Sequence, residues 1–498
     1  MRIAVALLAV LCALAAPAAV RAQTPAPVPL SFENSGPPAA QEPFLRGLAL
    51  LHNFEYPRAA EAFRQAQAAD PVFAMAYWGE AMTYNHPVWM EQDAAAARAV
   101  LARLGPTPEA RLARAPTARE RSLLEAVEIL YGEGSKEDRD RSYAAHLAGL
   151  ARSYRADVDV QAFYALSLLG LAHDGRDVRL YMRAAALLEP LYPAHPNHPG
   201  LLHYLIHAYD DPTHAPLGLR AARRYGDVAP DAPHARHMTS HIFLALGMWP
   251  EVVEANLAAD AEVDRLRAAA GDAPTSCGHY NEWLAYGYHQ LERHGDASVV
   301  ALACADQARA QAGGPPSPGT RPGPIASWAD MAVRAVVESG SPAPRETSLY
   351  AEGRPDVAFT LAYAQLLERG ADAGAVRSAR ARLVELDRAL ASALREPPHA
   401  PRRRAVILAQ AEGLELLRSG RAEPGLAALR RASEAERAMP AEFGPPLVEM
   451  PSFELLGDEL RRLGRNEEAR AAYRSALELA PGRRLSEAGL VAPDGARE

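Results

Sequence analysis

Residues 451–483, PSFELLGDELRRLGRNEEARAAYRSALELAPGR, contain the feature that most restricts the fold of this chain. Apolar residues recur in this stretch at helical spacing, in two runs that are separated by the turn residue Gly464. The small residues Gly457 and Ala476 allow the two helices to approach closely, and the ring of Tyr473 fills the space between them. The stretch therefore predicts two antiparallel helices that pack together and need similar neighbours to bury their remaining apolar surface.

The positions that define this helix pair keep a spacing that closely resembles the tetratricopeptide repeat family. They are Phe453, Leu456, Gly457, Leu460, Ala469, Tyr473, Ala476 and Pro481. A second set near the other end of the chain keeps the same spacing and continues one period later: Gly47, Leu50, Ala59, Phe63, Ala66 and Pro71, then Tyr77, Ala81 and Tyr84. The resemblance implies a superhelix of stacked helix pairs, whose concave groove binds a protein or peptide partner.

Between these two ends, helical apolar periodicity alternates with Gly, Pro or Asp breaks at intervals of about 15–20 residues, as expected for helix pairs. No segment shows the alternation that is typical of a strand. The sequence therefore predicts an all-α fold, an α-solenoid of stacked antiparallel helix pairs. The expected pairs and later helices cover residues 117–155, 159–190, 199–229, 234–270, 280–311, 326–339, 355–369, 373–395 and 402–419.

The chain divides into six expected segments. The opening MRIAVALLAVLCALAAPAAVRA is interpreted as a signal peptide over residues 1–22, followed by a disordered leader over 23–40. An N-terminal solenoid with the histidine-rich groove covers 41–312, and a C-terminal helical lobe covers 325–485, before a tail at 486–498. Between them, GGPPSPGTRPGP at 313–324 stops any helix. This linker is either a loop within one continuous solenoid or a hinge between two lobes.

The signal peptide predicts an exported protein, periplasmic or secreted, and most simply a protein of the bacterial periplasm. No second apolar run is long enough to span a bilayer, so no membrane span is expected after cleavage. The formal net charge of −8 offers no surface for nucleic acid.

Two cysteines remain after the signal peptide, Cys277 and Cys304. An oxidising compartment permits a disulfide between them. In an antiparallel helix pair, however, Cys304 lies about two turns from the level of Cys277, a mismatch of roughly 10 Å. That distance exceeds the reach of a disulfide, so we expect Cys304 to be a buried free thiol.

Histidines are concentrated between residues 198 and 241. His203 and His207 are four residues apart, and so are His237 and His241, so each pair shares one face of its helix. His237 follows His203 by 34 residues, and His241 follows His207 by the same interval. This interval is one tetratricopeptide period, so the pairs are expected at equivalent positions on the first helices of adjacent helix pairs.

The resemblance implies that these positions, with His234 before them, line the concave groove. Neighbouring helices in such a stack lie about 8–10 Å apart, so rings from both helices can meet at one ion about 2.0–2.1 Å from each nitrogen. Neutral imidazole suits transition metals such as Zn, Cu or Fe better than Ca or Mg. The expected groove residues are His203, His207, His234, His237, His241 and Asp210; the candidate metal ligands are His203, His207, His237 and His241, with His198 in reserve. Asp210 or Asp231 is expected to orient a ligand ring.

Three functions stay open at this point. The first is a binding protein with a histidine-lined metal or ligand site, the second a metalloenzyme that uses a redox or Lewis-acid metal, and the third a pure interaction scaffold without metal. A groove for an acidic or aromatic peptide, or simple duplication of a repeat, would also account for paired histidines. The segment around His279 and Trp283 is interpreted as mostly helix packing.

Familiar catalytic motifs are absent from the sequence. It contains no H-E-x-x-H, no glycine-rich phosphate loop, no G-x-S-x-G and no C-x-x-C. No glutamate lies between the paired histidines to act as a general base. The sequence therefore favours binding over catalysis, and it identifies no catalytic residue.

Overall fold

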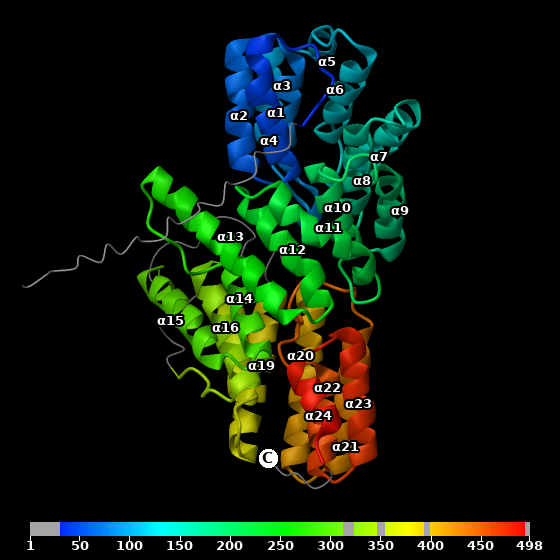
Figure 1. Cartoon of the computed structure of the whole chain (residues 1–498). Helices are drawn as coiled ribbons and strands as arrows, with labels where there is room; N and C mark the ends of the chain where they lie inside the picture. The colour runs from blue at the N-terminus through cyan, green and yellow to red at the C-terminus, as the bar shows by residue number, and fades with distance from the viewer. Residues whose placement is uncertain (1–29, 312–322, 346–353, 393–398, 494–498) are drawn as a thin grey trace, which may run out of the picture.

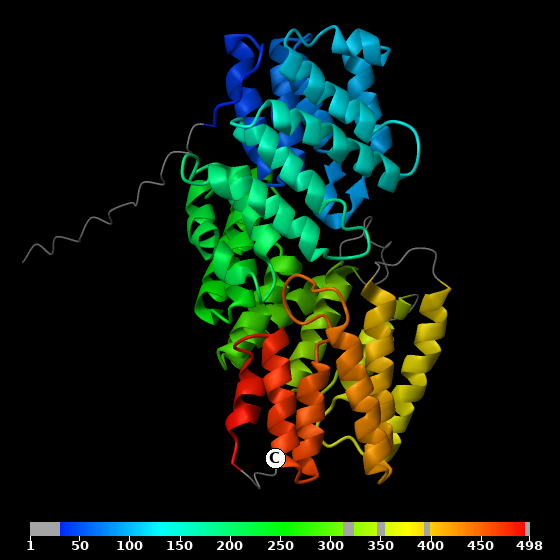
Figure 2. The same ribbon diagram turned by 90° about the vertical axis from the view of Figure 1, so that its right-hand side faces the viewer.

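The computed structural model describes residues 30–311, 323–345, 354–392 and 399–493. Within these ranges the chain is almost entirely helical, and successive helices pack side by side along its length (Figures 1 and 2). The expected all-α solenoid of stacked helix pairs is confirmed.

The helices of the first half run from α1 at the top of Figure 1 to α12 at its centre. Their bounds are α1 (Pro38–His52), α2 (Tyr56–Ala69), α3 (Ala74–Met82), α4 (Ala94–Leu104), α5 (Pro108–Leu112), α6 (Ala118–Leu130), α7 (Lys136–Ser153), α8 (Val158–Leu169), α9 (Val178–Leu188), α10 (Pro199–Tyr209), α11 (Ala215–Val228) and α12 (Pro233–Ala245). A short hairpin between α3 and α4 consists of β1 (Asn85–His86), the 3-10 turn η1 (Pro87–Trp89) and β2 (Glu91–Gln92), and a second turn, η2 (Glu189–Leu191), follows α9.

The second half continues downward in Figure 1. Its helices are α13 (Trp249–Ala270), α14 (His279–Gln290), α15 (His294–Gln311), α16 (Pro324–Ser339), α18 (Pro355–Leu366), α19 (Ala373–Ala391), α20 (His399–Arg418), α21 (Ala422–Arg437), α22 (Ser452–Arg462), α23 (Asn466–Leu479) and α24 (Arg484–Val491). None of the helices in the described ranges combines the length and the apolar character that crossing a bilayer requires.

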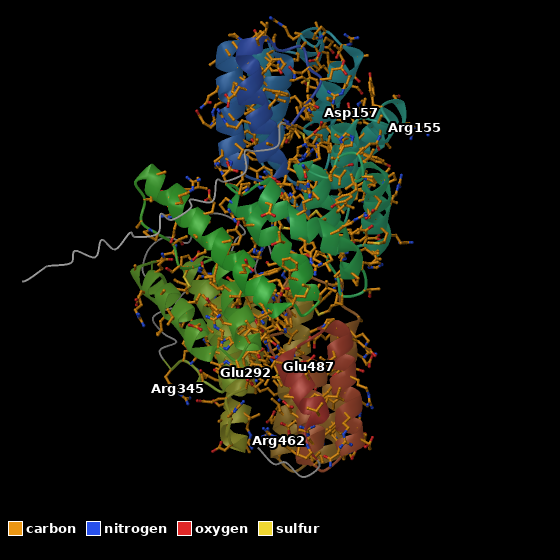
Figure 3. All side chains as sticks on the ribbon, viewed as in Figure 1. Arg155, Asp157, Glu292, Arg345, Arg462 and Glu487 are labelled. Carbon is orange, nitrogen blue, oxygen red and sulfur yellow. A yellow bond between two sulfur atoms is a disulfide. The ribbon has the colours of Figure 1, made fainter. Side chains whose placement is uncertain are left out.

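The stacking brings distant parts of the first half together at the centre of the molecule. The first helices of successive pairs contact each other, as α8, α10 and α12 do, and α1 also packs against α10. One hydrophobic core extends from Phe32 to Tyr286, and a second from Val333 to Tyr473. The outside is covered by charged side chains, of which Arg155, Arg345 and Glu487 are labelled in Figure 3.

The helices on either side of the expected linker pack directly against each other. Residues 313–322 of this linker lie outside the described ranges, but α15, which precedes it, contacts α16, which begins at its last residue, Pro324. A buried ion cluster also ties the helices before the linker to those after it. Arg483 donates to both carboxylate oxygens of Glu454 at 2.8 Å, to Glu338 at 2.6 Å and to the Tyr286 hydroxyl at 3.0 Å. This arrangement favours a loop within one solenoid over a free hinge.

Two of the expected segment boundaries are wrong. From residue 30 onward the expected leader is part of the fold, because Phe32 is buried against Phe44 and Trp78. The expected tail begins inside a helix, since α24 continues to Val491 and buries Ser486. The amino-acid composition of these two segments does not indicate that either one packs against the rest of the fold. The proposed signal peptide lies outside the described residues.

The expectation of a free Cys304 is also wrong. Cys277 and Cys304 form a disulfide, with their Cα atoms 4.6 Å apart. Cys277 does not belong to a helix, because it lies near the end of a non-helical segment, residues 272–278, that runs beside α15. Hydrogen bonds between Gln307 and this segment, at Pro274 and Ser276, hold it beside Cys304.

Candidate functional site

Two helices that contact each other, α10 and α12, place most of the histidines. Pro199 and Pro233 stand in the first turn of α10 and α12, where a missing N–H costs nothing. From these starts, α10 carries His203 and His207 one turn apart, and α12 carries His237 and His241 in the same way. The contact between α10 and α12 then brings the two pairs together.

The four expected ligands, together with His234, form a continuous array of rings. Ring centroids lie 4.8 Å apart for His203 and His207, 5.9 Å for His207 and His241, and 4.9 Å for His237 and His241. His234 lies 5.1 Å from His203 and 6.3 Å from His237. The ligand atoms, however, divide between two groups of three instead of meeting at one point: His203, His207 and His234 in one, and His237, His241 and His279 in the other.

The first group, His203–His207–His234, has ring nitrogens that lack partners. Nδ1 of His203 donates to the backbone carbonyl of His52 at 2.7 Å, which leaves its Nε2 as a lone-pair nitrogen. This Nε2, both nitrogens of His207 and Nε2 of His234 are buried without any hydrogen-bond partner. The ligand atoms of the three residues lie within 4.8 Å of one another.

The second group, His237–His241–His279, is oriented by polar neighbours. Nδ1 of His237 donates to the Asn256 side-chain oxygen at 2.7 Å, and Nδ1 of His241 donates to Asp210 at 2.5 Å. The Nε2 atoms of the two rings face each other at 3.1 Å. His279, at the start of α14, completes the group and is exposed. Asp210 thus lies where an orienting carboxylate was expected.

A third group, His52, Asp159 and His198, also has the spacing of a metal site but is hydrogen-bonded throughout. His52 and His198 both contact one carboxylate oxygen of Asp159, at 2.9 and 3.1 Å. The second nitrogen of His52 bonds the Tyr204 hydroxyl, and that of His198 accepts the Leu201 N–H as the N-cap of α10. We therefore assign His198, the reserve ligand of the sequence argument, a structural role.

The expectation that these histidines line an open groove is wrong. His203, His207, His237 and His241 are only 0–4 % exposed. Burial lowers the pKa of His203 to about 3, and it holds the pKa of His207, His234 and His237 well below the ordinary value. These rings are therefore neutral at physiological pH, the form in which imidazole binds metals.

A loop from the C-terminal half covers the histidines. Phe443, which lies between α21 and α22, places its ring 5.7 Å from that of His207 and 5.9 Å from that of His241. The next residue, Gly444, has a φ of +91° and packs so closely on Trp283 that a Cβ atom would lie 2.3 Å from the indole. A side chain at this position would force the loop away from the histidines.

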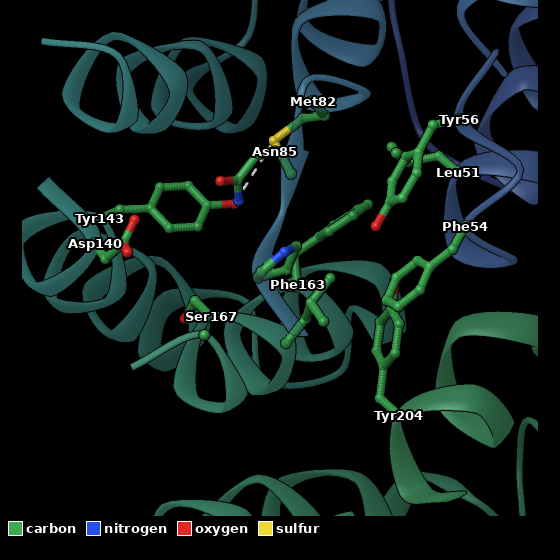
Figure 4. A pocket seen from close by; sticks show the side chains of 13 residues that line it. Leu51, Phe54, Tyr56, Met82, Asn85, Asp140, Tyr143, Phe163, Ser167 and Tyr204 are labelled. Carbon is green, nitrogen blue, oxygen red and sulfur yellow. Dashed lines mark hydrogen bonds between the residues drawn. The ribbon is translucent and has the colours of Figure 1, made fainter. Parts of the chain in front are cut away.

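Two cavities adjoin this region. The smaller, of about 20 Å³, lies beside Phe54, Tyr143 and Tyr204 and holds about one water molecule (Figure 4). The larger, of about 360 Å³, lies between the turn after α10 and the segment 436–453, and Asp210 and His214 are among the residues that line it. The carboxylate that orients His241 therefore also faces a cavity large enough for a small molecule.

Sequence reasoning missed three residues of these groups: His52, Asp159 and His279. His52 lies 151 residues before His203, with which its carbonyl bonds, and no local pattern joins them. His279 does not follow the 34-residue period. The reason is that α13 has 22 residues, so that α14 begins later in the sequence than the period predicts. The position of His279 in the first turn of the helix after the histidine pair was the available signal.

Comparison with known protein families matches one helix pair of this chain. The model of the tetratricopeptide repeat family matches residues 451–483. Comparison with curated proteins gives no match. Among solved structures, the APC/C hetero-tetramer Cut9–Hcn1 is similar at 11 % identity and a TM-score of 0.38, over 92 % of this chain and 77 % of that chain. The human IFIT1 dimer with m7Gppp-AAAA is similar at 13 % identity and a TM-score of 0.38, over 92 % and 96 %.

The matched segment coincides with α22 and α23, the helix pair that the spacing of apolar residues predicts over residues 451–483. The preceding helices stack in the same manner. Repeats of this kind stack into extended surfaces and indicate a scaffold for protein interaction. The chain therefore contains a tetratricopeptide repeat over residues 451–483 and has an all-α solenoid fold.

Proposed function

We propose that this scaffold binds a transition-metal ion in its interior, at His203, His207 and His234. The observation that supports the proposal is the set of four buried ring nitrogens without partners in this group. Leaving one buried polar atom unpaired costs about 1–3 kcal/mol. A purely structural role for these three adjacent rings would therefore carry a large cost in folding free energy. A bound ion would instead pair with one nitrogen of each ring.

The chemistry of the group supports the same proposal. Nδ1 of His203 donates to a backbone carbonyl, the arrangement that fixes the tautomer of a ligand histidine and points Nε2 at the ion. Imidazole-only ligands suit Zn, Cu or Fe. Three protein ligands leave a further coordination position, and whether this position serves catalysis depends on what reaches it.

Metal analysis tests this function directly. The purified full chain is stripped with a chelator, reconstituted separately with Zn²⁺, Cu²⁺ and Fe²⁺, desalted and analysed by mass spectrometry of the elements. We expect at least one ion per chain to be retained for one of the three metals, and we expect His207→Phe to lose one ion. Retention of none of the three metals would overturn the proposal and would leave a metal-free interaction scaffold.

We also propose that the protein is exported. The apolar N-terminal sequence motivates this proposal, and the Cys277–Cys304 disulfide supports it, because disulfides persist in oxidising compartments. Fractionation of cells that produce the full chain, with non-reducing mass spectrometry of the purified product, tests both points. A protein that stays in the cytoplasm with two free thiols would contradict the proposal.

A further inference from the structure

We propose that His237, His241 and His279 hold a second transition-metal ion beside the first, so that the solenoid contains a binuclear centre with six imidazole ligands. The pairing of the two ions rests on the proposed function above. The second site stands on a separate observation, the contact between the His237 and His241 rings.

Hydrogen bonds orient both rings in the contact between His237 and His241. The Asn256 side-chain oxygen and the Asp210 carboxylate only accept, so Nδ1 of both rings carries the proton. The Asn256 amide is itself oriented, because its nitrogen donates to the Val252 carbonyl at 2.8 Å. The Nε2 atoms of the two rings are thereby turned toward each other, 3.1 Å apart.

A metal ion accounts for this distance. Two imidazole nitrogens at about 2.0–2.1 Å from one tetrahedral ion lie about 3.3 Å from each other. A proton on Nε2 of His241 would also join the two rings, with Asp210 balancing the charge of the imidazolium. The ligand atom of His279 also lies within 4.8 Å of the other two, a closeness that a proton shared by His237 and His241 does not require. The convergence of three rings favours the metal.

The two groups are neighbours because helix α12 contributes histidines to both of them. Helix α12 carries His234 of the first group one turn before His237 of the second. The His207 and His241 rings, one from each group, have centroids 5.9 Å apart. Ions bound to both groups would therefore interact.

The two sites differ in their access to solvent. The first group is enclosed, whereas His279 of the second is exposed. Asp210, which orients His241, lines the cavity of about 360 Å³. With three protein ligands and an exposed side, the second ion keeps a coordination position that an external ligand can reach. The proposed centre thus pairs an enclosed site with an exposed one.

Copper loading of the full chain tests the proposal. The stripped protein is titrated with Cu²⁺ and desalted, and its copper content and electron paramagnetic resonance spectrum are measured. We expect two copper ions per chain in the wild type. We expect one in His279→Ala, one in His207→Phe and none in the double variant. His241→Gln serves as a second variant of the open site, and His195→Ala, a histidine outside all three groups, as the control that keeps two.

The spectrum reports whether the ions are neighbours. Two adjacent Cu²⁺ ions couple magnetically, so we expect dipolar broadening in the wild type that disappears in each single-site variant. Two copper ions with independent, additive spectra would overturn the binuclear centre. One copper ion that His207→Phe removes and His279→Ala retains would overturn the second site alone, whereas no bound copper would overturn the second site whichever metal the first one takes.

Discussion

Asp210, the residue that follows α10, accepts a hydrogen bond of 2.5 Å from Nδ1 of His241 on α12. Both side chains are buried, at 3 % and 4 % exposed. The contact fixes the tautomer of His241 and turns its Nε2 toward His237 and His279. A carboxylate in this position increases the basicity of a ligand histidine.

We expect Asp210→Asn to weaken copper binding at the second group by about 10–100-fold, the usual effect of losing such a partner. Competition with a chelator of known affinity measures the change. Asp211→Asn is the matched control, since Asp211 bonds Arg176 and His214 and contacts none of the six proposed ligands through a hydrogen bond. Equal affinity in Asp210→Asn and wild type would contradict the assigned role.

His207→Phe is expected to stabilise the metal-free protein by about 1–3 kcal/mol, because neither nitrogen of His207 has a partner to lose. Chemical denaturation in the presence of a chelator measures the free energy of unfolding. His203→Phe is the control, and it should destabilise the fold, since it leaves the His52 carbonyl without its donor. A loss of stability in metal-free His207→Phe would indicate a structural role for the ring.

His198→Ala is expected to destabilise the protein by about 1–3 kcal/mol without changing its metal content. The substitution removes the N-cap of α10 and a donor to Asp159, whose pKa burial would raise but the bonds from His198 and His52 lower. His198→Asn should restore part of the loss, because asparagine is a good N-cap. Thermal melts and elemental analysis check both expectations, and a loss of metal would place His198 among the ligands.

Arg483→Met is expected to destabilise the fold by about 3–5 kcal/mol, because it leaves Glu338 and Glu454 buried without a cation. Denaturation by urea measures the change. Adding Glu338→Gln and Glu454→Gln should recover much of it, since the buried charges are then gone. Arg465→Ala, on an exposed ion pair, is the control and should stay within about 0.5 kcal/mol of the wild type.

Asp458 gives the protein a pH dependence. Burial and the charge of Glu454 raise the pKa of Asp458 to about 7, against about 3.9 in an unfolded chain. The folded state therefore favours the protonated form, and this contribution to stability is complete below about pH 4 and is lost as pH rises through about 7. Asp458→Asn keeps an acceptor for the Tyr473 hydroxyl, which donates to Asp458 at 2.6 Å.

We expect Asp458→Asn to gain in melting temperature relative to the wild type between pH 5 and pH 8. Calorimetry at both pH values, with a chelator present, measures the difference. Asp306→Asn, an exposed carboxylate, is the control. A difference between variant and wild type that is constant from pH 5 to pH 8 would contradict the assignment.

The fold was predictable because its signals are local and repeat. Tyr473 and Gly457 contact each other within one helix pair, and the same spacing recurs around Phe63 and Gly47. The sequence also brought His203, His207, His237 and His241 together, since the repeat period fixes their places on adjacent helices. Metal binding at these residues stays a prediction.

The rest depended on contacts that no local pattern contains. Phe443, in a loop more than 200 residues further along the chain, covers His207. The histidines that were expected to line a groove are therefore buried inside the protein. The length of α13 displaced His279 from the period, and the folded-back segment before it brought Cys277 to Cys304. In each case the contact depends on the length or the path of one segment of the chain.

The position of Phe443 also bears on the order of assembly. During synthesis the six histidines leave the ribosome well before residue 443 does, and N-terminal segments fold first. The histidines are thus accessible for a period in which the loop that later covers them does not yet exist. An ion captured in that interval would be locked in place when the loop docks, whereas an ion supplied afterwards must wait for the loop to open.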